Sequence, residues 1–361
     1  MSRKPAHRVL VTGGAGFVGS SLALALAQRH ADWEVLALDN LKRRGSELNL
    51  PRLRAGGVRF VHGDVREPGD LEALPPCQAI VECSAEPSAL AGRDGSTAYA
   101  VRSNLVGAWH CLELARHRRA QLVFLSTSRV YPVAALNALA FEETATRFEL
   151  LSEQSLPGAS PAGIAEDFPL DGARTLYGTT KLSAELLIAE YRDAFGLRAV
   201  VNRCGVIAGP WQMGKVDQGV FTHWMLAHLF GGRLSYIGFG GTGKQVRDLL
   251  HVEDLIDLVE RQLLDPRAWD GVTANVGGGR DVSLSLAETT ALCREISGNE
   301  IPVSTAGHHR PGDVPLYVSD CSRLFGLTDW RPRRGAREVL EDIAAWIGAN
   351  AREVRSALGA P

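Results

Sequence analysis

Lysine is scarce in this chain of 361 residues, since only five of its 39 basic side chains are lysines and the others are arginines. These basic groups face 41 acidic ones, and the formal net charge is only −2. Nothing in that balance favours nucleic acid or a charged membrane surface as a partner. No stretch of 18 apolar residues occurs either, so we expect no membrane-spanning helix.

Cysteine lacks any recurring pattern. There is no Cys-x-x-Cys, which argues against a zinc site. A chain of this length needs no disulfides to fold, so the cysteines are expected to be reduced thiols of a cytoplasmic protein. The apolar run Val9–Val11 is too short for the core of a signal peptide. The six cysteines are Cys77, Cys83, Cys111, Cys204, Cys293 and Cys321.

Glycine, by contrast, is abundant, with 38 residues. These glycines follow no Gly-X-Y period, which excludes collagen. They must therefore serve turns or the close approach of a ligand. The length allows about two domains, or one large α/β unit with an appendage.

Short apolar runs alternate with longer amphipathic segments through the first 130 residues. Such alternation predicts a parallel sheet with helices on both faces, whereas an antiparallel α+β arrangement is the alternative. The expected strands are 7–12, 34–38, 58–61, 79–81, 121–125 and 199–201, and the expected helices are 20–28, 99–117, 176–192, 285–296 and 337–347.

Residues 132–174 interrupt this alternation. The segment contains four prolines and seven acidic residues and has little periodicity. A loop of this length in a compact domain is usually a lid or a binding segment, and otherwise disordered. We expect a lid.

A glycine-rich turn follows the first predicted strand and opens a helix. Gly14, Gly16 and Gly19 match the spacing Gly-x-Gly-x-x-Gly, while Gly13, Gly16 and Gly19 match Gly-x-x-Gly-x-x-Gly. Glycines at this place allow a tight turn and let a pyrophosphate rest on the helix N-terminus. The turn therefore predicts a Rossmann-type doubly wound sheet that binds a dinucleotide.

Asp39 ends the second predicted strand, 20 residues after Gly19. A carboxylate there would hold the adenosine ribose hydroxyls and repel a 2′-phosphate, which predicts NAD rather than NADP. Arg43 and Arg44 are the nearby features that favour NADP. Asp64, at the end of the third strand, is placed to reach the adenine.

Tyr177 and Lys181 are four residues apart on a predicted helix and share one of its faces. No other tyrosine has a lysine four residues later. A neighbouring ammonium lowers the pKa of a phenol, so that Tyr177 could remove the proton of a substrate alcohol. An exposed helix pair is the alternative interpretation.

Three hydroxyl residues, Ser126, Thr127 and Ser128, directly follow the fifth predicted strand. Ligands of open α/β sheets bind at this carboxyl end, so one of the hydroxyls could contact the reacting oxygen. A purely structural hydroxyl cluster remains the alternative.

Together these features resemble the extended short-chain dehydrogenase/reductase superfamily over essentially the whole chain. The resemblance implies a catalytic set of Thr127, Tyr177 and Lys181, in which Lys181 also holds the ribose of the cofactor. It further implies that the NAD site is lined by Phe17, Val18, Asn40, Val65, Ala85, Asn104, Cys204 and Val206.

Segments 216–220 and 243–251 look like the CDP-paratose 2-epimerase branch of that superfamily. By this similarity Arg247 would bind the diphosphate of a nucleotide sugar, with Arg310 as a second candidate. Ser128 and Gln218 are further expected substrate contacts. The strand end at 202–206 departs from the branch, which leaves the sugar open.

The resemblance implies an NAD-dependent epimerase that acts at C2 of a CDP-hexose, by transient oxidation to a keto-sugar and re-reduction. A 4-epimerase or 4,6-dehydratase of the same superfamily and a non-catalytic NAD-sensing regulator are the alternatives. Thr127 is not followed by the acid pair of dehydratases, and Tyr177 and Lys181 argue against a regulator.

The same resemblance implies an NAD-binding domain at 1–205, to which 246–277 returns, and a smaller C-terminal substrate-binding lobe at 206–361. It also implies a homodimer, or a tetramer, that pairs through the tyrosine-bearing helix and the helix before the fifth strand. Leu182, Leu186 and Leu187 lie on that helix beside Tyr177.

Overall fold

The computed structural model describes residues 7–88, 90–93, 96–214, 218–308 and 310–358. Its centre is a seven-stranded sheet in the order β14-β10-β5-β4-β1-β2-β3, and every paired strand is parallel. The predicted α/β fold is confirmed. The strands are β1 (His7–Thr12), β2 (Trp33–Asp39), β3 (Arg59–His62), β4 (Ala79–Glu82), β5 (Gln121–Thr127), β10 (Ala199–Cys204) and β14 (Thr273–Val276).

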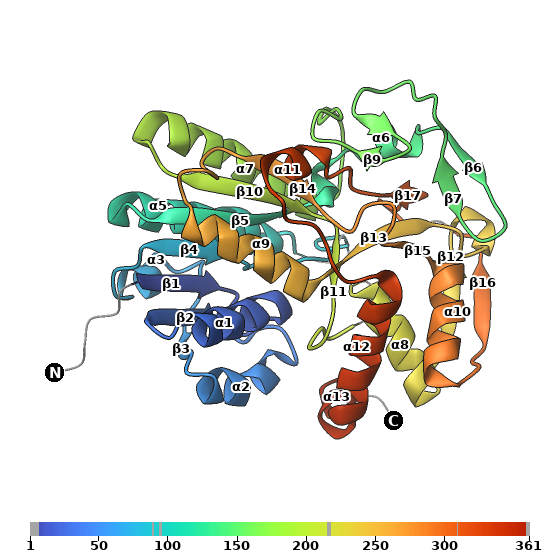
Figure 1. Ribbon diagram of the computed structural model, residues 1–361, viewed down its shortest axis with the longest axis horizontal. Coiled ribbons are helices and arrows are strands. Elements are labelled where there is room, and N and C mark those ends of the chain that lie inside the picture. The colour runs from blue at the N-terminus through green and yellow to red at the C-terminus, as the bar shows by residue number, and fades with distance from the viewer. Residues whose placement is uncertain (1–6, 89, 94–95, 215–217, 309, 359–361) are drawn as a thin grey trace.

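Helices cover both faces of this sheet (Figure 1). The helices α1 (Phe17–Arg29) and α9 (Val252–Leu264) share one apolar core with one face of the strands. On the other face, α3 (Pro68–Glu72), α5 (Gly107–Arg118) and α7 (Leu176–Phe195) form a second core. Strands buried on both faces need near-continuous apolar sequences, and β1 and β5 have them.

The predicted helix at 99–117 is a composite in the structure. It begins as α4 (Ala98–Val101), passes through a π-helical turn at Arg102–Val106 and continues as α5. A π-helical turn leaves one extra residue in the helix and is often found at functional sites. Here it carries Ser103 and Asn104 toward the carboxyl end of the sheet.

A second lobe follows β10. Its apolar core joins α8 (Val220–Phe230), α10 (Leu286–Ser297) and α12 (Ala336–Ala349). Two small sheets flank this core: β12 (Leu234–Ile237) pairs with β16 (Val303–Ala306), and β13 (Val246–His251) pairs with β11 (Val206–Ala208), β15 (Ser283–Ser285) and β17 (Leu316–Tyr317).

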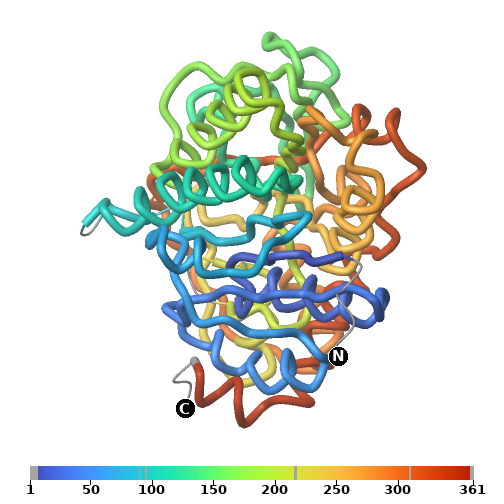
Figure 2. The backbone as a smooth tube through the Cα atoms, turned by 90° about the vertical axis from the view of Figure 1, so that its left-hand side faces the viewer, coloured from blue at the N-terminus to red at the C-terminus, as the bar shows by residue number. Residues whose placement is uncertain are grey.

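Within the expected return at 246–277, α9 and β14 pack with the central sheet, while β13 belongs to the second lobe. The chain then adds α11 (Ser322–Leu327) beside β14 and ends in α13 (Ala351–Leu358). Figure 2 shows α13 at the lower edge of the molecule, and α2 (Leu50–Ala55) precedes β3 in the first lobe. A hydrogen bond from Arg44 to the carbonyl of Ser356, 3.1 Å long, ties α13 to the loop after β2.

The segment 132–174 does not have the expected role of a lid. It folds into α6 (Val133–Asn137) and two short hairpins, β6–β7 and β8–β9, formed by Phe141–Glu143, Phe148–Leu150, Ala159–Ser160 and Gly163–Ile164. Backbone bonds from Phe148 to Lys244 (2.9 Å) and from Ile164 to Val318 (2.8 Å) fasten it to the second lobe. None of its residues lines the large cavity described below.

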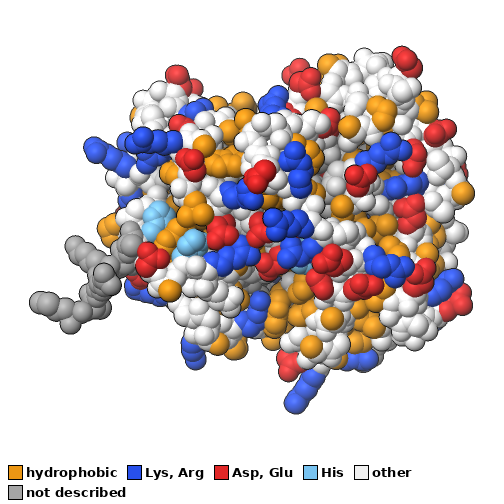
Figure 3. Space-filling view, viewed as in Figure 1, with side chains coloured by type: hydrophobic (Ala, Val, Ile, Leu, Met, Phe, Trp, Pro, Cys, Tyr) orange, Lys and Arg blue, Asp and Glu red, His pale blue; other side chains and the backbone are white. Residues whose placement is uncertain are grey.

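The surface carries no large area of one charge on the face drawn in Figure 3, where acidic and basic side chains alternate. Within the described ranges, no helix is both long and apolar enough to cross a lipid bilayer.

Candidate active site

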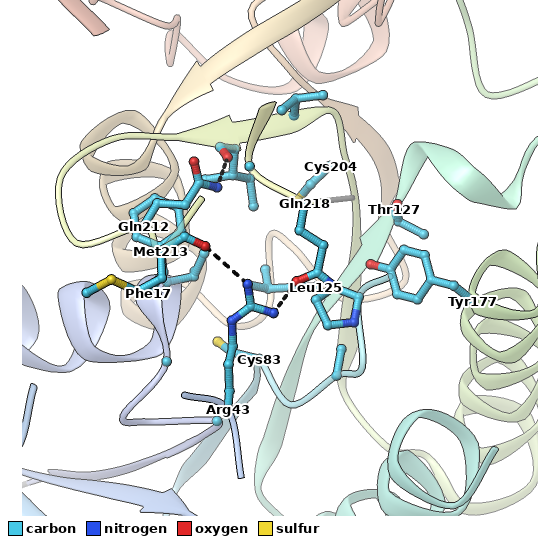
Figure 4. Close-up of a pocket in the computed structure, with 18 of the residues that line it drawn as sticks. Phe17, Arg43, Cys83, Leu125, Thr127, Tyr177, Cys204, Gln212, Met213 and Gln218 are labelled. Carbon is cyan, nitrogen blue, oxygen red and sulfur yellow. Dashed lines mark hydrogen bonds between the residues drawn. The ribbon is translucent and has the colours of Figure 1, made fainter. Parts of the chain in front are cut away.

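One cavity of about 510 Å³ opens at the carboxyl end of the central sheet, between the two lobes. Its walls come from the loops after β1, β2, β4, β5 and β10 and from α8, β12 and β13 of the second lobe (Figure 4). The order of strands reverses between β1 and β4, and ligands of doubly wound sheets bind at such a point.

The glycine-rich turn fits a pyrophosphate. Gly13 has a φ of +62°, and a side chain at Gly19 would collide with the Gly13 carbonyl. A Cβ at Gly14 would lie 2.6 Å from Ala37, so Gly13, Gly14 and Gly19 are structurally required, whereas a Cβ at Gly16 would lie 3.1 Å from the Gly13 carbonyl. Helix α1 follows Gly16 without a side-chain cap or an acid in its first turn, which leaves its N–H groups free for an anion.

The acids after β2 and β3 lie at the far end of the same cavity. Asp39 accepts hydrogen bonds from the backbone of Ala15 (3.0 Å) and Leu41 (2.8 Å), and burial raises its pKa. Burial would also raise the pKa of Asp64, but hydrogen bonds from Arg66 and Asn40 outweigh it and lower that pKa to about 2. Asp64 is therefore an anion at neutral pH, and Asp39 has a fixed orientation.

Tyr177 lies in the first turn of helix α7. The hydroxyl of Thr175 caps the helix by accepting from the Gly178 amide at 3.2 Å. A side chain at Gly178 would collide with the Arg129 carbonyl, so this glycine lets α7 approach the turn Ser128–Val130 after β5. The predicted helix face thus meets the predicted hydroxyl residues directly.

Thr127 and Tyr177 lie next to each other, with the phenol directed at the threonine (Figure 4). Burial raises the pKa of Tyr177, while the charge of Lys181 and the Thr127 hydroxyl act in the opposite direction. Lys181 is buried, 3.1 Å from Glu82 and 4.4 Å from the ring centre of Phe124. Burial alone would lower its pKa, but the Glu82 and Tyr177 charges raise it, so Lys181 is an ammonium.

The two serines beside Thr127 differ in position. Ser126 donates its hydroxyl hydrogen to Glu185, which also forms a buried ion pair with Arg203 at 2.8 Å. Ser128 lines the cavity without such an anchor. All three hydroxyl residues line the cavity, but the Ser126 hydroxyl already donates to Glu185, which leaves Thr127 and Ser128 as the candidates for a ligand contact.

Asn104 does not line the cavity. Its side chain bonds both the amide and the carbonyl of Glu86, at 2.7 and 3.1 Å, and donates to the Thr180 hydroxyl at 3.1 Å. It links the loop after β4 to α7 behind the wall of the cavity. The other expected cofactor contacts do line it: Gly13, Gly16, Phe17, Val18, Gly19, Asp39, Asn40, Asp64, Val65, Ala85, Cys204 and Val206.

The expected substrate contacts lie at the second lobe's end of the cavity. Arg247 donates to Asp313 at 2.7 Å and to the carbonyls of Val246 and Val314, and burial lowers its pKa to about 10. Arg310 lines the same region. A guanidinium held by a carboxylate in a buried pocket is suited to a phosphate group.

Gln218 crosses the cavity. Its carbonyl accepts from Arg43, and its amide donates to Glu86 at 3.2 Å (Figure 4). It therefore links the loops after β2 and β4 to the segment before α8. Two residues of its motif, Val216 and Asp217, lie outside the described residues.

The sequence did not indicate three contacts of the site: Glu82 with Lys181, Arg43 with Gln218, and Asp313 with Arg247. Glu82 had a visible signal, because an acid ends the otherwise apolar strand Ala79–Glu82 at the carboxyl edge of the sheet. Asp313 had none beyond its closeness to Arg310 in sequence. In the described part of the chain, no group of three or more His, Cys, Asp or Glu could hold a metal ion.

Comparisons with known proteins agree with this geometry. Residues 9–277 match the model of the NAD dependent epimerase/dehydratase family. The chain is 30% identical to a CDP-paratose 2-epimerase of Salmonella typhi, covering 95% of this chain and 99% of that one. It is 31% identical to a dTDP-glucose 4,6-dehydratase of Streptomyces niveus, over 95% of this chain and 93% of that one.

A solved structure of UDP-glucuronic acid 4-epimerase from Bacillus cereus, in complex with UDP-glucuronic acid and NAD, has the same fold. The TM-score is 0.78 at 23% identity, and the alignment covers 95% of this chain and 99% of that one. The family match covers well over half of the chain, and the cavity contains the glycine turn and the acids that a dinucleotide needs. The chain belongs to the NAD dependent epimerase/dehydratase family, and it is an enzyme whose cofactor is NAD.

Proposed function

We propose that this enzyme inverts C2 of the sugar in a CDP-hexose. The observation that carries the chemistry is the placement of Tyr177, Thr127 and Lys181 in one cavity with a dinucleotide turn and two arginines. The position of inversion and the cytidine rest on the likeness in sequence of segments 216–220 and 243–251, and of the chain as a whole, to a CDP-paratose 2-epimerase.

Each residue has a defined task in this reaction. Tyr177 removes the proton from the sugar hydroxyl, since Lys181 supplies the positive charge that stabilises a phenolate. Thr127 donates a hydrogen bond to the oxygen as it becomes a carbonyl. NAD, when bound, supplies a reversible hydride acceptor. The cavity walls keep the keto-sugar enclosed until the hydrogen returns to the opposite face.

The NAD contacts belong to the first lobe. Gly13, Gly16 and Gly19 would receive the pyrophosphate on the N-terminus of α1, with Phe17 and Val18 in its first turn. Asp39 would hold the adenosine ribose and Asp64 the adenine, and Lys181 would reach the nicotinamide ribose. The nucleotide sugar would place its diphosphate at Arg247 and Arg310, with Ser128 and Gln218 near the sugar.

The test is an NMR assay of the purified enzyme, with NAD, on CDP- and UDP-hexoses. Inversion at C2 of a CDP-hexose is the expected result. Inversion at C4 would replace the proposal by a 4-epimerase, and loss of water by a 4,6-dehydratase. The second outcome is disfavoured because Ser128 and Arg129, rather than two acids, follow Thr127. Absence of any product would refute the proposal.

We also propose that two copies of the chain pair through α5 and α7. Three large apolar side chains on these helices are exposed: Trp109 on α5, and Leu186 and Phe195 on α7. Leu182 and Leu187 are partly buried against the cores. Light scattering at micromolar concentration should give a dimer, and Leu186→Glu should give a monomer; a monomeric parent protein would refute this pairing.

A further inference from the structure

Glu82 is the one carboxylate, among the described residues, in contact with the Lys181 ammonium. It ends β4, and its side chain is 1% exposed, against 2% for Lys181. The oxygen Oε2 accepts from Lys181 at 3.1 Å, and the oxygen Oε1 is buried without a hydrogen-bond partner. The family's established chemistry gives no task to this acid, since Thr127, Tyr177 and Lys181 already complete the proposed set.

A buried carboxylate at this place changes the charge that Tyr177 experiences. Lys181 alone would present a full positive charge to the phenol, one helical turn away on α7. With Glu82 in contact, the ammonium and the carboxylate act from a distance as a dipole. Because both side chains are buried, this offset is weakly screened.

The other titratable groups that face this cluster are thiols. Cys83 follows Glu82 on the same strand end, Cys204 ends β10 beside Tyr177, and Cys111 of α5 lies behind Glu82. Burial raises the pKa of all three thiols, that of Cys204 to about 12. They are neutral at physiological pH, and Phe124 of β5 is uncharged, so Glu82 is the acid that faces the ammonium. Burial raises the pKa of Glu82, and the charge and hydrogen bond of Lys181 oppose this rise.

We propose that Glu82 is a positioning residue that holds the Lys181 ammonium beside Tyr177 and offsets its charge there. Two consequences follow. The ammonium cannot swing away from the phenol, because Glu82 fixes one side of it and the Phe124 ring another. The negative charge of Glu82 also keeps the pKa of the Tyr177 phenol higher than the ammonium alone would set it.

The decisive variant is Glu82→Gln, which keeps the shape of the side chain and removes its charge. Tyrosinate absorbance is titrated in the NAD-bound enzyme, and the signal of Tyr177 is isolated by subtracting the titration of Tyr177→Phe. The pKa of Tyr177 should fall by about one unit in Glu82→Gln, because the first proton now leaves a cluster with one more positive charge. An unchanged or higher pKa would overturn the inference.

Glu185→Gln is the matched control. Glu185 is also a buried glutamate in an ion pair, lies on α7 four residues after Lys181, and does not line the cavity. Its loss should leave the titration of Tyr177 unchanged, even where it lowers thermal stability. A shift as large as that of Glu82→Gln would mean that any buried charge affects Tyr177, and would overturn the specific role of Glu82.

Should Glu82→Gln fail to fold, Glu82→Asp replaces it. The shorter acid keeps the charge but draws it away from Lys181, so a smaller fall in the pKa of Tyr177 is expected, and no fall would refute the role. The inference rests on the proposed function for Tyr177 as the base, and the titration needs no substrate. A shifted Tyr177 in an enzyme inactive on every hexose would thus refute the reaction and support Glu82.

Discussion

The two ends of the cavity are constructed differently. At the cofactor end, the contacts that shape the turn stay within the first lobe: the Gly16 amide donates to the Gly13 carbonyl at 3.0 Å, and the Ala15 amide donates to Asp39 at 3.0 Å. At the substrate end, Arg247 is held by Asp313, which lies 66 residues away, and Gln218 is held by Arg43, 175 residues away. The cofactor turn is specified within the first lobe, whereas the substrate end depends on contacts between segments far apart in sequence, among them the contact of Gln218 with Arg43 across the two lobes.

This difference predicts which substitutions weaken NAD binding and which weaken binding of the nucleotide sugar. A substitution in the glycine-rich turn cannot be accommodated by another conformation, because the backbone itself is constrained there. A substitution at the substrate end removes one hydrogen-bonding side chain and leaves the other side chains of that end in place. Four experiments test this comparison, in descending order of expected effect.

Tyr177→Phe should lower kcat by about 100- to 10,000-fold, because it removes the proposed base and leaves both ends of the cavity intact. NAD binding, followed by calorimetry, should change little. The control is Tyr191→Phe on the same helix, whose hydroxyl bonds Glu113 at 2.5 Å away from the cavity. Activity close to that of the parent enzyme in Tyr177→Phe would remove the catalytic argument.

Gly19→Ala should weaken NAD binding at least tenfold, about 1.4 kcal/mol or more, because the new methyl group would collide with the Gly13 carbonyl. Calorimetric titration with NAD measures this loss. Gly348→Ala on α12 is the control, since a methyl group there meets nothing within 4 Å. Equal NAD affinities in the two variants would contradict the local specification of the cofactor end.

Arg247→Ala should raise the KM for the nucleotide sugar by about 10- to 100-fold and leave NAD affinity unchanged, since a charge-assisted hydrogen bond contributes about 1.5–3 kcal/mol. Steady-state kinetics and calorimetry separate the two quantities. Arg280→Ala is the control, because Arg280 forms an exposed ion pair with Glu149 and does not line the cavity. A loss of NAD affinity in Arg247→Ala would show that the two ends are not separable.

The fourth experiment concerns Asp248 on β13, at the junction of the two lobes. Its carboxylate packs against Gly205 and Gly277. Burial raises its pKa to about 6, above the unfolded value of about 3.9. The folded protein therefore binds a proton that the unfolded chain has released. The resulting stability is present below about pH 4 and is lost as the pH rises through about 6.

Urea unfolding of the parent protein should thus show a fall in the free energy of unfolding on the order of 2–3 kcal/mol between pH 4 and pH 7 that Asp248→Asn lacks. The difference between the two proteins isolates this residue from other titrating groups. Parallel pH curves would mean that Asp248 keeps an ordinary acidity in the folded state.

The strand and helix pattern of the first lobe was predictable because each element is buried on a regular face, so apolar period and glycine position reveal it. The strand at 121–125 and the helix at 176–192 agree with β5 and α7 to within a few residues. The segment 132–174 was not predictable as two hairpins and a short helix, because these are held by backbone hydrogen bonds to Lys244, just before β13, and to Val318, just after β17, which no local pattern records.

By itself, the sequence determined the parallel sheet, the dinucleotide turn and the Tyr177–Lys181 pair, since each depends on spacings of a few residues. Only the tertiary structure decided that Asn104 supports the wall, that Asp313 holds Arg247, and that Glu82 reaches Lys181 from 99 residues away. The reason is physical: a buried charge needs a partner, and packing alone selects which distant residue supplies it.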